Sequence, residues 1–320
     1  MLNKFIPKTI RGKLMALTAS LTLLITILTT SVCFSVFQSF LRKNQIQSAE
    51  FSLQVANNNI AADMKDIIYF SKWCCSNEAI LDYLEAFKDE SRLPTADKDT
   101  ENLRPLALST HNRLKEEYYN TRSNEYISRV IISSTNKNNF LQMSASANNS
   151  SGYAATIIKE QPFYSHLYES GDFLWEGMIE DPFSKISKDT FLPIVRPIYN
   201  KFNSKIIGWN YVEVSSKLFT DYLSSYPLAG DSVLLLTMGN KTYDFHSGRW
   251  EETQIPYKDP IPMSEKESLS EGTRVFSATG EDGRKRIIVE RQIDGMNGLH
   301  LSQILSEQQF QQQKKLYMLL

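Results

Sequence analysis

The hydrophobic pattern divides the chain into an uncharged N-terminal stretch, a long amphipathic helix and a strand-rich remainder. Residues 14–40 contain no charged side chain. As a helix they would extend about 40 Å, more than the roughly 30 Å of a hydrocarbon core. A cleaved secretory signal has an apolar region of about 7–15 residues and a small-residue cleavage site, and neither is evident here. We therefore predict an uncleaved transmembrane helix at 14–40, after an N-terminal segment at 1–13.

The charges that flank this span predict its orientation. Four basic residues and no acidic residue precede it, whereas only Arg42 and Lys43 follow it directly. Because basic residues are retained on the cytoplasmic side, the pattern favours a cytoplasmic N-terminus at 1–13. Residues 41–315 would then be extracytoplasmic, in a protein of the cell membrane.

A stalk helix is predicted at 41–76, because apolar residues recur there at spacings of three and four and neither Gly nor Pro interrupts them. Two interpretations are open for this seam: the helix packs on the core of its own domain, or it pairs with the same helix of a second copy in a parallel dimer. The seam consists of Ile46, Ala49, Leu53, Ala56, Ile60, Met64, Ile67 and Phe70.

Beyond the stalk the pattern changes from helical to strand-like. Helices are predicted at about 77–88 and 103–119, and a short helix at "KLFTDYLSSY". A Pro-rich loop is expected at 256–262. The predicted strands are "EYISRVIISS", "FLQMSASA", "GDFLWEGMI", "FLPIVRPIYN", "KIIGWNYVEVS", "SVLLLTMG", "KTYDFHS", "TRVFSATG", "RKRIIVER" and "GLHLSQILS".

Helices followed by meandering strands indicate an α+β fold rather than a doubly wound parallel sheet. We expect a larger, membrane-distal unit at 77–228 and a smaller, membrane-proximal unit at 229–305. The remaining segment, 306–320, is predicted to be an exit helix that ends with two lysines and five apolar residues. We interpret this ending as the start of a second, truncated transmembrane helix.

Composition excludes several classes of function. After Lys43, the remaining 29 basic residues face all 36 acidic residues, a net charge of −7, which argues against binding to nucleic acid. Cys74 and Cys75 are adjacent and Cys33 lies in the predicted span, so a disulfide framework is not expected. The four histidines form no metal-type cluster, and no phosphate-binding glycine loop is present. We predict no catalytic residue, no metal site and no cofactor.

The order of these segments resembles the double Cache, or tandem PAS-like, sensor domains of bacterial receptors. The resemblance covers about residues 40–315 and depends on "FYSHLYESGDFLWEGMIEDP", "RPIY" and "IIGWNYVEVSSKLFTDYL". It implies two PAS-like antiparallel units, of which the membrane-distal one binds a ligand. The basic "KTIRGKL" lead is most similar to sensor histidine kinases of two-component systems, whose kinase core would lie beyond Leu320. Chemotaxis receptors and diguanylate cyclases share such ectodomains. This region itself is not expected to be an enzyme.

Six residues are predicted to bind the solute in the larger unit. The strand period places Trp209, Tyr211 and Glu213 on one face. An arginine in an apolar strand, Arg196, must extend its charged end to solvent, pair with a carboxylate or meet a ligand. For Arg196, a structural ion pair is the alternative to ligand contact. The set is completed by Tyr164 and Trp175. Core packing is the alternative role of Trp175 and Trp209.

The nature of the solute follows from a departure from the family pattern. Double Cache domains that bind amino acids carry Tyr-x4-Arg-x-Trp-Tyr-x2-Ala and a distal acid. Here only Tyr164 and, by type, Glu213 match, and Gln161 stands where the arginine clamps a carboxylate. An amino acid is therefore disfavoured, and we expect a sugar, because Trp175 and Trp209 would suit its apolar face if both face the pocket. A homodimer is also expected. The alternative function is a membrane-anchored module that binds a partner protein or the cell wall without a small solute.

Overall fold

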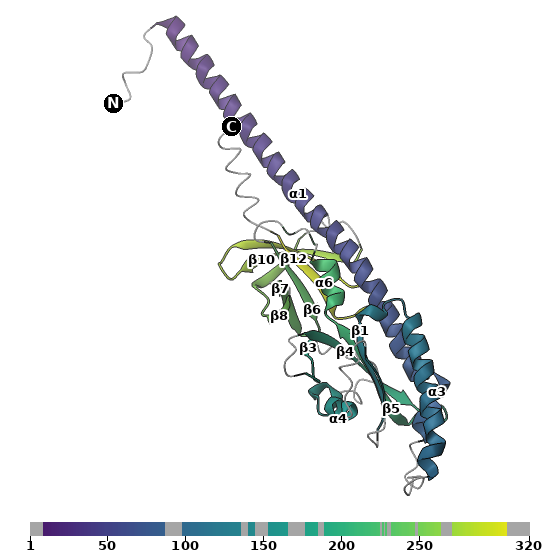
Figure 1. Cartoon of the computed structure of the whole chain (residues 1–320). Coiled ribbons are helices and arrows are strands. Elements are labelled where there is room, and N and C mark those ends of the chain that lie inside the picture. Colours follow the sequence, from purple (N-terminus) through teal and green to yellow (C-terminus); the bar gives the residue numbers. More distant parts are fainter. Residues whose placement is uncertain are drawn as a thin grey trace.

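The fold is described by a computed structural model in which one helix, α1 (Ile10–Ser76), runs along both sheets (Figure 1). The Thr9 side chain caps this helix by accepting a hydrogen bond from the Gly12 amide at 3.3 Å. The helix contains both the predicted span and the predicted stalk without interruption. The structure describes residues 9–86, 98–135, 140–144, 153–165, 177–184, 189–224, 226, 228, 232–246, 249–263 and 271–305.

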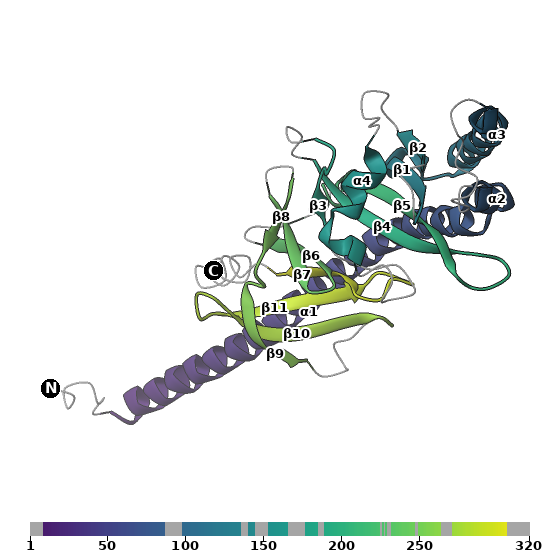
Figure 2. The ribbon, with the colours of Figure 1, turned by 90° about the horizontal axis from the view of Figure 1, so that it is seen from below.

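The N-terminal part of α1 is long and apolar enough to cross a membrane. Its most apolar window has a mean hydropathy of 2.0, and none of that window is buried in the protein. The helix extends beyond the folded body in both views (Figures 1 and 2). Length, composition and exposure therefore agree with a membrane anchor.

The C-terminal part of α1 packs on the core of its own chain. All eight apolar residues of the predicted seam are between 0% and 4% exposed. This confirms the first interpretation of the seam, and a dimer through those residues is wrong because they already contact the two sheets. The exposed side of α1 carries different apolar residues: Phe51, Val55, Ala62 and Tyr69.

Two antiparallel sheets follow the helix, as an α+β fold with two PAS-like units requires. The first sheet has five strands in the order β2-β1-β5-β4-β3, and the second has seven in the order β8-β7-β6-β12-β11-β10-β9. The strands of the first sheet are β1 (Ile127–Ser134), β2 (Phe140–Ser144), β3 (Ile179–Glu180), β4 (Thr190–Tyr199) and β5 (Ile206–Ser215). Those of the second are β6 (Val233–Met238), β7 (Lys241–His246), β8 (Arg249–Thr253), β9 (Tyr257–Pro262), β10 (Thr273–Gly280), β11 (Lys285–Gln292) and β12 (Leu299–Ile304).

The remaining helices surround the first sheet. In Figure 2, α2 and α3 lie beside the end of α1, and α4 lies on the other face of the sheet. α6 connects the two sheets in sequence. The helices are α2 (Glu78–Ala86), α3 (Lys98–Asn120), the 3-10 turn η3 (Asn124–Tyr126), α4 (Ala154–Lys159) and α6 (Lys217–Leu223).

Most predicted elements within the described residues are confirmed, but helix α4 was not predicted, and only the last three residues of the predicted strand "GDFLWEGMI" are described. Residues 256–262 were expected to be a loop, but they form edge strand β9, paired with β10. Proline lacks an amide donor, and Pro260 and Pro262 are tolerated because only one side of β9 has a neighbour. Strand β8 was not predicted. The predicted exit helix at 306–320 lies outside the described residues.

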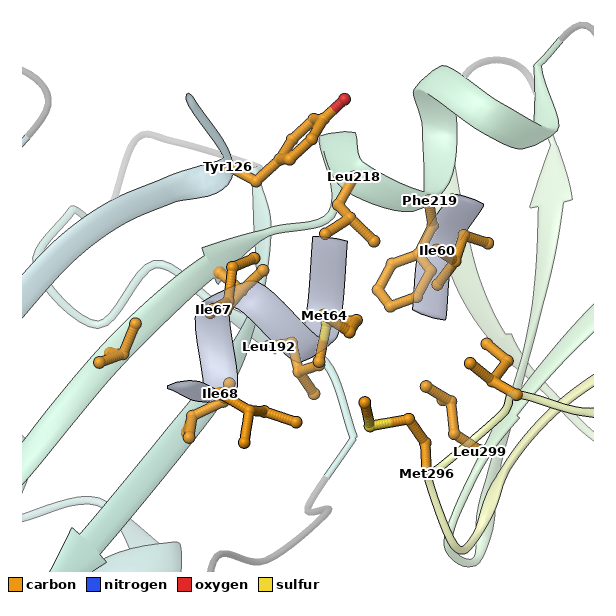
Figure 3. Close-up of a cluster of buried hydrophobic side chains, with 14 of the residues drawn as sticks. Ile60, Met64, Ile67, Ile68, Tyr126, Leu192, Leu218, Phe219, Met296 and Leu299 are labelled. Carbon is orange, nitrogen blue, oxygen red and sulfur yellow. The ribbon is translucent and has the colours of Figure 1, made fainter. Parts of the chain in front are cut away.

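One hydrophobic core joins the two units through α1. Ile60, Met64 and Ile67 of α1 form a continuous cluster with residues of both sheets (Figure 3). The partners on the larger unit include Leu192, and those on the smaller unit include Leu299. The helix is therefore the shared support on which both sheets are placed.

Candidate functional site

The candidate site lies on the face of the five-stranded sheet that is turned away from α1. On β5, Trp209, Tyr211 and Glu213 alternate with residues that face the helix, as the strand period predicted. Strand register then adds cross-strand neighbours on the same face. These are Ser133, Ile131 and Arg129 on β1 and Pro197, Val195 and Pro193 on β4.

Aromatic side chains form the wall of this face. Trp209 and Tyr211 are fully buried. The Tyr164 ring lies edge-on to Trp209, with ring centroids 5.6 Å apart, and Phe163 stacks on Tyr211 at 6.1 Å. Helix α4 covers the same cluster with small and aliphatic residues: Ala154, Ala155 and Ile158. The arrangement is a packed aromatic and aliphatic cluster with few polar groups.

A buried ion pair lies within this aromatic wall. The Glu213 Oε1 and Arg129 Nε atoms are 3.6 Å apart, and each side chain is only 1% exposed. The Tyr211 hydroxyl donates a hydrogen bond to Glu213 Oε2 at 2.9 Å. The ring of Phe183 covers the guanidinium group, 3.6 Å from its central carbon. Positive and negative charge are thus both present on an otherwise apolar face.

Burial perturbs the titration of this cluster. Desolvation raises the pKa of the Glu213 carboxyl to about 7, although Arg129 and the Tyr211 hydrogen bond counteract it. The pKa of Tyr211 is raised by burial and by the neighbouring Glu213 charge. The nearby charge of Asp181 raises both. Perturbed carboxyl groups inside an enclosed face are typical of functional sites.

Trp209 contributes a hydrogen-bond donor without an acceptor. Within the described part of the chain, its indole N–H is buried and makes no hydrogen bond. An unsatisfied buried donor costs about 1–3 kcal/mol, and a solute oxygen placed there would remove that cost.

The structure does not bring all six predicted residues together. Tyr164, Trp209, Tyr211 and Glu213 lie on one face. Arg196 lies on the other, because it is paired in register with Asn210, whose side chain donates a hydrogen bond to the Ser71 carbonyl of α1 at 2.8 Å. Trp175 lies outside the described residues.

Sequence reasoning missed three residues of the cluster. Arg129 was detectable, because it is a charged residue inside the apolar run "YISRVIISS". Asp181 and Phe183 follow the two-residue strand β3, where the sequence shows no periodicity. Only the fold places that segment over the Arg129–Glu213 pair.

A metal site and a surface hollow are the alternatives to the sheet face. No group of three His, Cys, Asp or Glu side chains that could hold a metal ion occurs among the described residues. A surface hollow of about 300 Å³ lies beside α1, near Asp63 and Asp66. Ser123 donates hydrogen bonds to both carboxylates, from its hydroxyl to Asp63 at 2.7 Å and from its amide to Asp66 at 2.8 Å. This hollow is open and its acids are already engaged, so the sheet face is the stronger candidate.

Comparisons with known proteins support the fold. No protein-family model and no curated protein matches the sequence. The ligand-binding domain of the Pseudomonas aeruginosa PAO1 amino acid chemoreceptor PctC, in complex with GABA, matches with a TM-score of 0.50 and 10% identity, over 82% of this chain and 100% of that one. The sensor domain of the V. cholerae histidine kinase DctB matches with a TM-score of 0.47 and 9% identity, over 82% and 98%.

At this level of identity the first match is informative about the fold alone. It extends over all of the PctC domain and over both sheets of this chain. Together with the long N-terminal helix and the two antiparallel sheets, it identifies the architecture. The chain has the double Cache fold, with two PAS-like units carried on one helix.

Proposed function

We propose that this chain is the solute-sensing region of a membrane-anchored receptor, and that the solute binds at Trp209, Tyr211 and Glu213. The observation that carries the proposal is the buried Arg129–Glu213 pair on the aromatic face of the first sheet. Burying two charges is costly, and an apolar pair of similar size would serve stability as well or better. A binding role accounts for charges at this position.

Both charges of the pair suit a solute that is itself a zwitterion. A carboxylate would interact with the Arg129 guanidinium and an ammonium group with Glu213. Arg129, on β1, would then supply the positive charge that the family's arginine provides at the position that Gln161 occupies here. The similar PctC domain holds GABA, which carries both an amino group and a carboxylate. These points favour amino compounds over the sugar expected from the sequence.

The described residues give the sugar hypothesis little support. A sugar carries no charge, so it would leave both members of the buried Arg129–Glu213 pair without a charged partner. The second tryptophan of that hypothesis, Trp175, lies outside the described residues. Sugars therefore remain in the experiment as a comparison class.

Thermal unfolding of the full chain in detergent, with amino acids, GABA, organic acids and sugars, tests the proposal. A solute at 100 times its dissociation constant stabilises the folded state by about 2.7 kcal/mol. We expect a rise in Tm with an amino compound and no rise in Glu213→Gln. The exposed carboxylate variant Glu252→Gln on β8 should respond like the parent. A flat response to every class would contradict solute sensing and favour the partner-binding or wall-binding module.

We also infer the topology and the output of the receptor. The basic lead favours a cytoplasmic N-terminus, which reporter fusions at residues 1 and 43 would test. The output is proposed to be a sensor histidine kinase, ahead of a chemotaxis receptor or a diguanylate cyclase. The coding sequence after codon 320 tests this: a further apolar run of about 15 residues and a kinase region support it, and another output module contradicts it.

A further inference from the structure

A direct contact connects the two units next to the candidate site. Tyr243, on β7 of the second sheet, is 3% exposed, and its hydroxyl oxygen accepts a hydrogen bond from the Met178 amide at 2.8 Å. Met178 directly precedes β3 of the first sheet. In both Figure 1 and Figure 2, β3 lies on the side of the first sheet that is next to the second sheet.

The approach at this contact is close enough to require glycine. A Cβ atom on Gly177 would lie 2.3 Å from the Tyr243 hydroxyl oxygen and 2.7 Å from Cδ of Lys241. Gly177 also has a φ of +85°, which disfavours other residues. The backbone of the first unit is therefore fitted directly onto a side chain of the second.

The segment held by Tyr243 continues into the site. Residues 177–184 enter β3, whose pairing to β4 fixes Ile179 opposite Phe191. The chain then turns at Asp181, which accepts a hydrogen bond from the Phe183 amide at 2.9 Å. Phe183 covers Arg129, the partner of Glu213. Four residues, 179–182, thus separate Met178, which contacts the second sheet, from Phe183, which covers the ion pair.

The geometry points to Tyr243 as a positioning residue that acts on the solute site from the other unit, through the segment 177–184. The inference rests on the proposed function and adds a route of regulation to it. A movement of Phe183 and Asp181 when solute binds would displace Met178 and hence β7. Because such coupling is reciprocal, a shift of the second sheet would alter the site equally.

Hydrogen exchange of the full chain in detergent, with no solute, tests this role. In Tyr243→Phe the Met178 amide loses its acceptor. We expect amides at 178–183 to exchange about tenfold faster, while those of β10, β11 and β12 change less than about twofold. The matched control is Tyr257→Phe in the same sheet, whose hydroxyl makes no hydrogen bond in the described part of the chain. It should leave both regions unchanged.

A second readout separates positioning from a purely structural role. Release of Asp181 and Phe183 removes a negative charge and a cover from the Arg129–Glu213 pair. The titration midpoint of Glu213, measured by carbon NMR, should therefore fall from about 7 in the parent toward 4.5 in Tyr243→Phe, and stay unchanged in Tyr257→Phe.

Three results would overturn the inference: unchanged exchange at 178–183, an equal increase in β10–β12, or an unchanged Glu213 titration. If Tyr243→Phe does not fold, Gly177→Ala replaces it, because its Cβ pushes the same contact apart and the same results are expected. No solute is involved in either measurement. A negative outcome here is therefore distinct from a failure of the solute panel.

Discussion

At the scale of single residues, the chemistry of the larger unit depends on Glu213, whose carboxyl group is harder to ionise because it is buried. Glu213 has a pKa of about 7, against an ordinary value of 4.5, even though Arg129 and Tyr211 both favour its charged form. Desolvation therefore outweighs the two stabilising contacts. A bound cation would change the protonation state of Glu213, because a nearby positive charge favours the ionised carboxylate.

This shift predicts a dependence of stability on pH. Between pH 4.5 and 7 the folded state holds a proton on Glu213 that the unfolded state has released. The free energy of unfolding should therefore fall as the pH rises through this window, by up to about 3 kcal/mol, and be flat above it. Urea unfolding of the parent and of Glu213→Gln at each pH isolates this contribution as the difference between the two. The free energy of unfolding of the parent minus that of the variant should fall across this window, and a rise of this quantity with pH would contradict the assignment.

Two arginines show how far residue-level reasoning from the sequence extends. Arg196 and Arg129 both lie in apolar strands, and strand alternation alone does not tell which of them lies on the face of the candidate site. Which side of a sheet faces a helix is decided by packing of distant elements. α1 covers the Arg196 side, so the arginine that was not predicted, Arg129, is the one beside Glu213.

At the scale of elements, buried strands were predictable, whereas the two edge strands of the second sheet were not. β4 and β5 are buried along most of their length and read as continuous apolar runs with polar interruptions. β9 and β8 are largely exposed edges, so burial leaves little pattern on them. Their pairing comes from the neighbouring strands β10 and β7 rather than from their own sequence.

The spacing between β5 and α2 depends on one glycine. A Cβ on Gly208 would lie 2.6 Å from the Ser133 carbonyl oxygen and 2.8 Å from a methyl group of Leu84. Because the backbone carbonyl cannot yield easily, Gly208→Ala should lower the free energy of unfolding by about 1–3 kcal/mol. Urea unfolding measures this.

Gly280→Ala is the matched control for that substitution. Its nearest atom, at 2.8 Å, is the end of the Asp282 side chain, which can move. We expect a loss well below that of Gly208→Ala. Equal losses would show that the close backbone approach at Gly208 is not what limits this position.

At the scale of the whole molecule, both units rest on one helix that also reaches the membrane. A solute at 100 times its dissociation constant contributes about 2.7 kcal/mol, whereas moving a two-state receptor from 1:99 to 99:1 requires about 5.5 kcal/mol. One site would only bias such a switch. Two sites in a symmetric dimer would supply nearly the whole difference, which favours a dimer.

Among the described residues, the exposed side of α1 offers an apolar surface for a second copy. Val55, Ala62 and Tyr69 recur there at intervals of seven residues, and Phe51 lies one turn before Val55. Apolar residues at a seven-residue spacing form the contact line of paired parallel helices. Two copies anchored in the same membrane would be parallel. The sequence could not reveal this side, because its apolar residues are fewer than those of the buried seam.

Cysteine cross-linking in membranes tests this surface. In a Cys33→Ser background, Ala62→Cys should form a disulfide-linked dimer under mild oxidation, because residues on a shared contact line bring their Cα atoms within the reach of a disulfide. Ala61→Cys is the matched control, since Ala61 packs against the core of its own chain and should stay monomeric. If Ala62→Cys stays monomeric as well, α1 is not the dimer contact. The switch would then require a dimer through another interface, or a single site with a much larger difference in affinity between the two states.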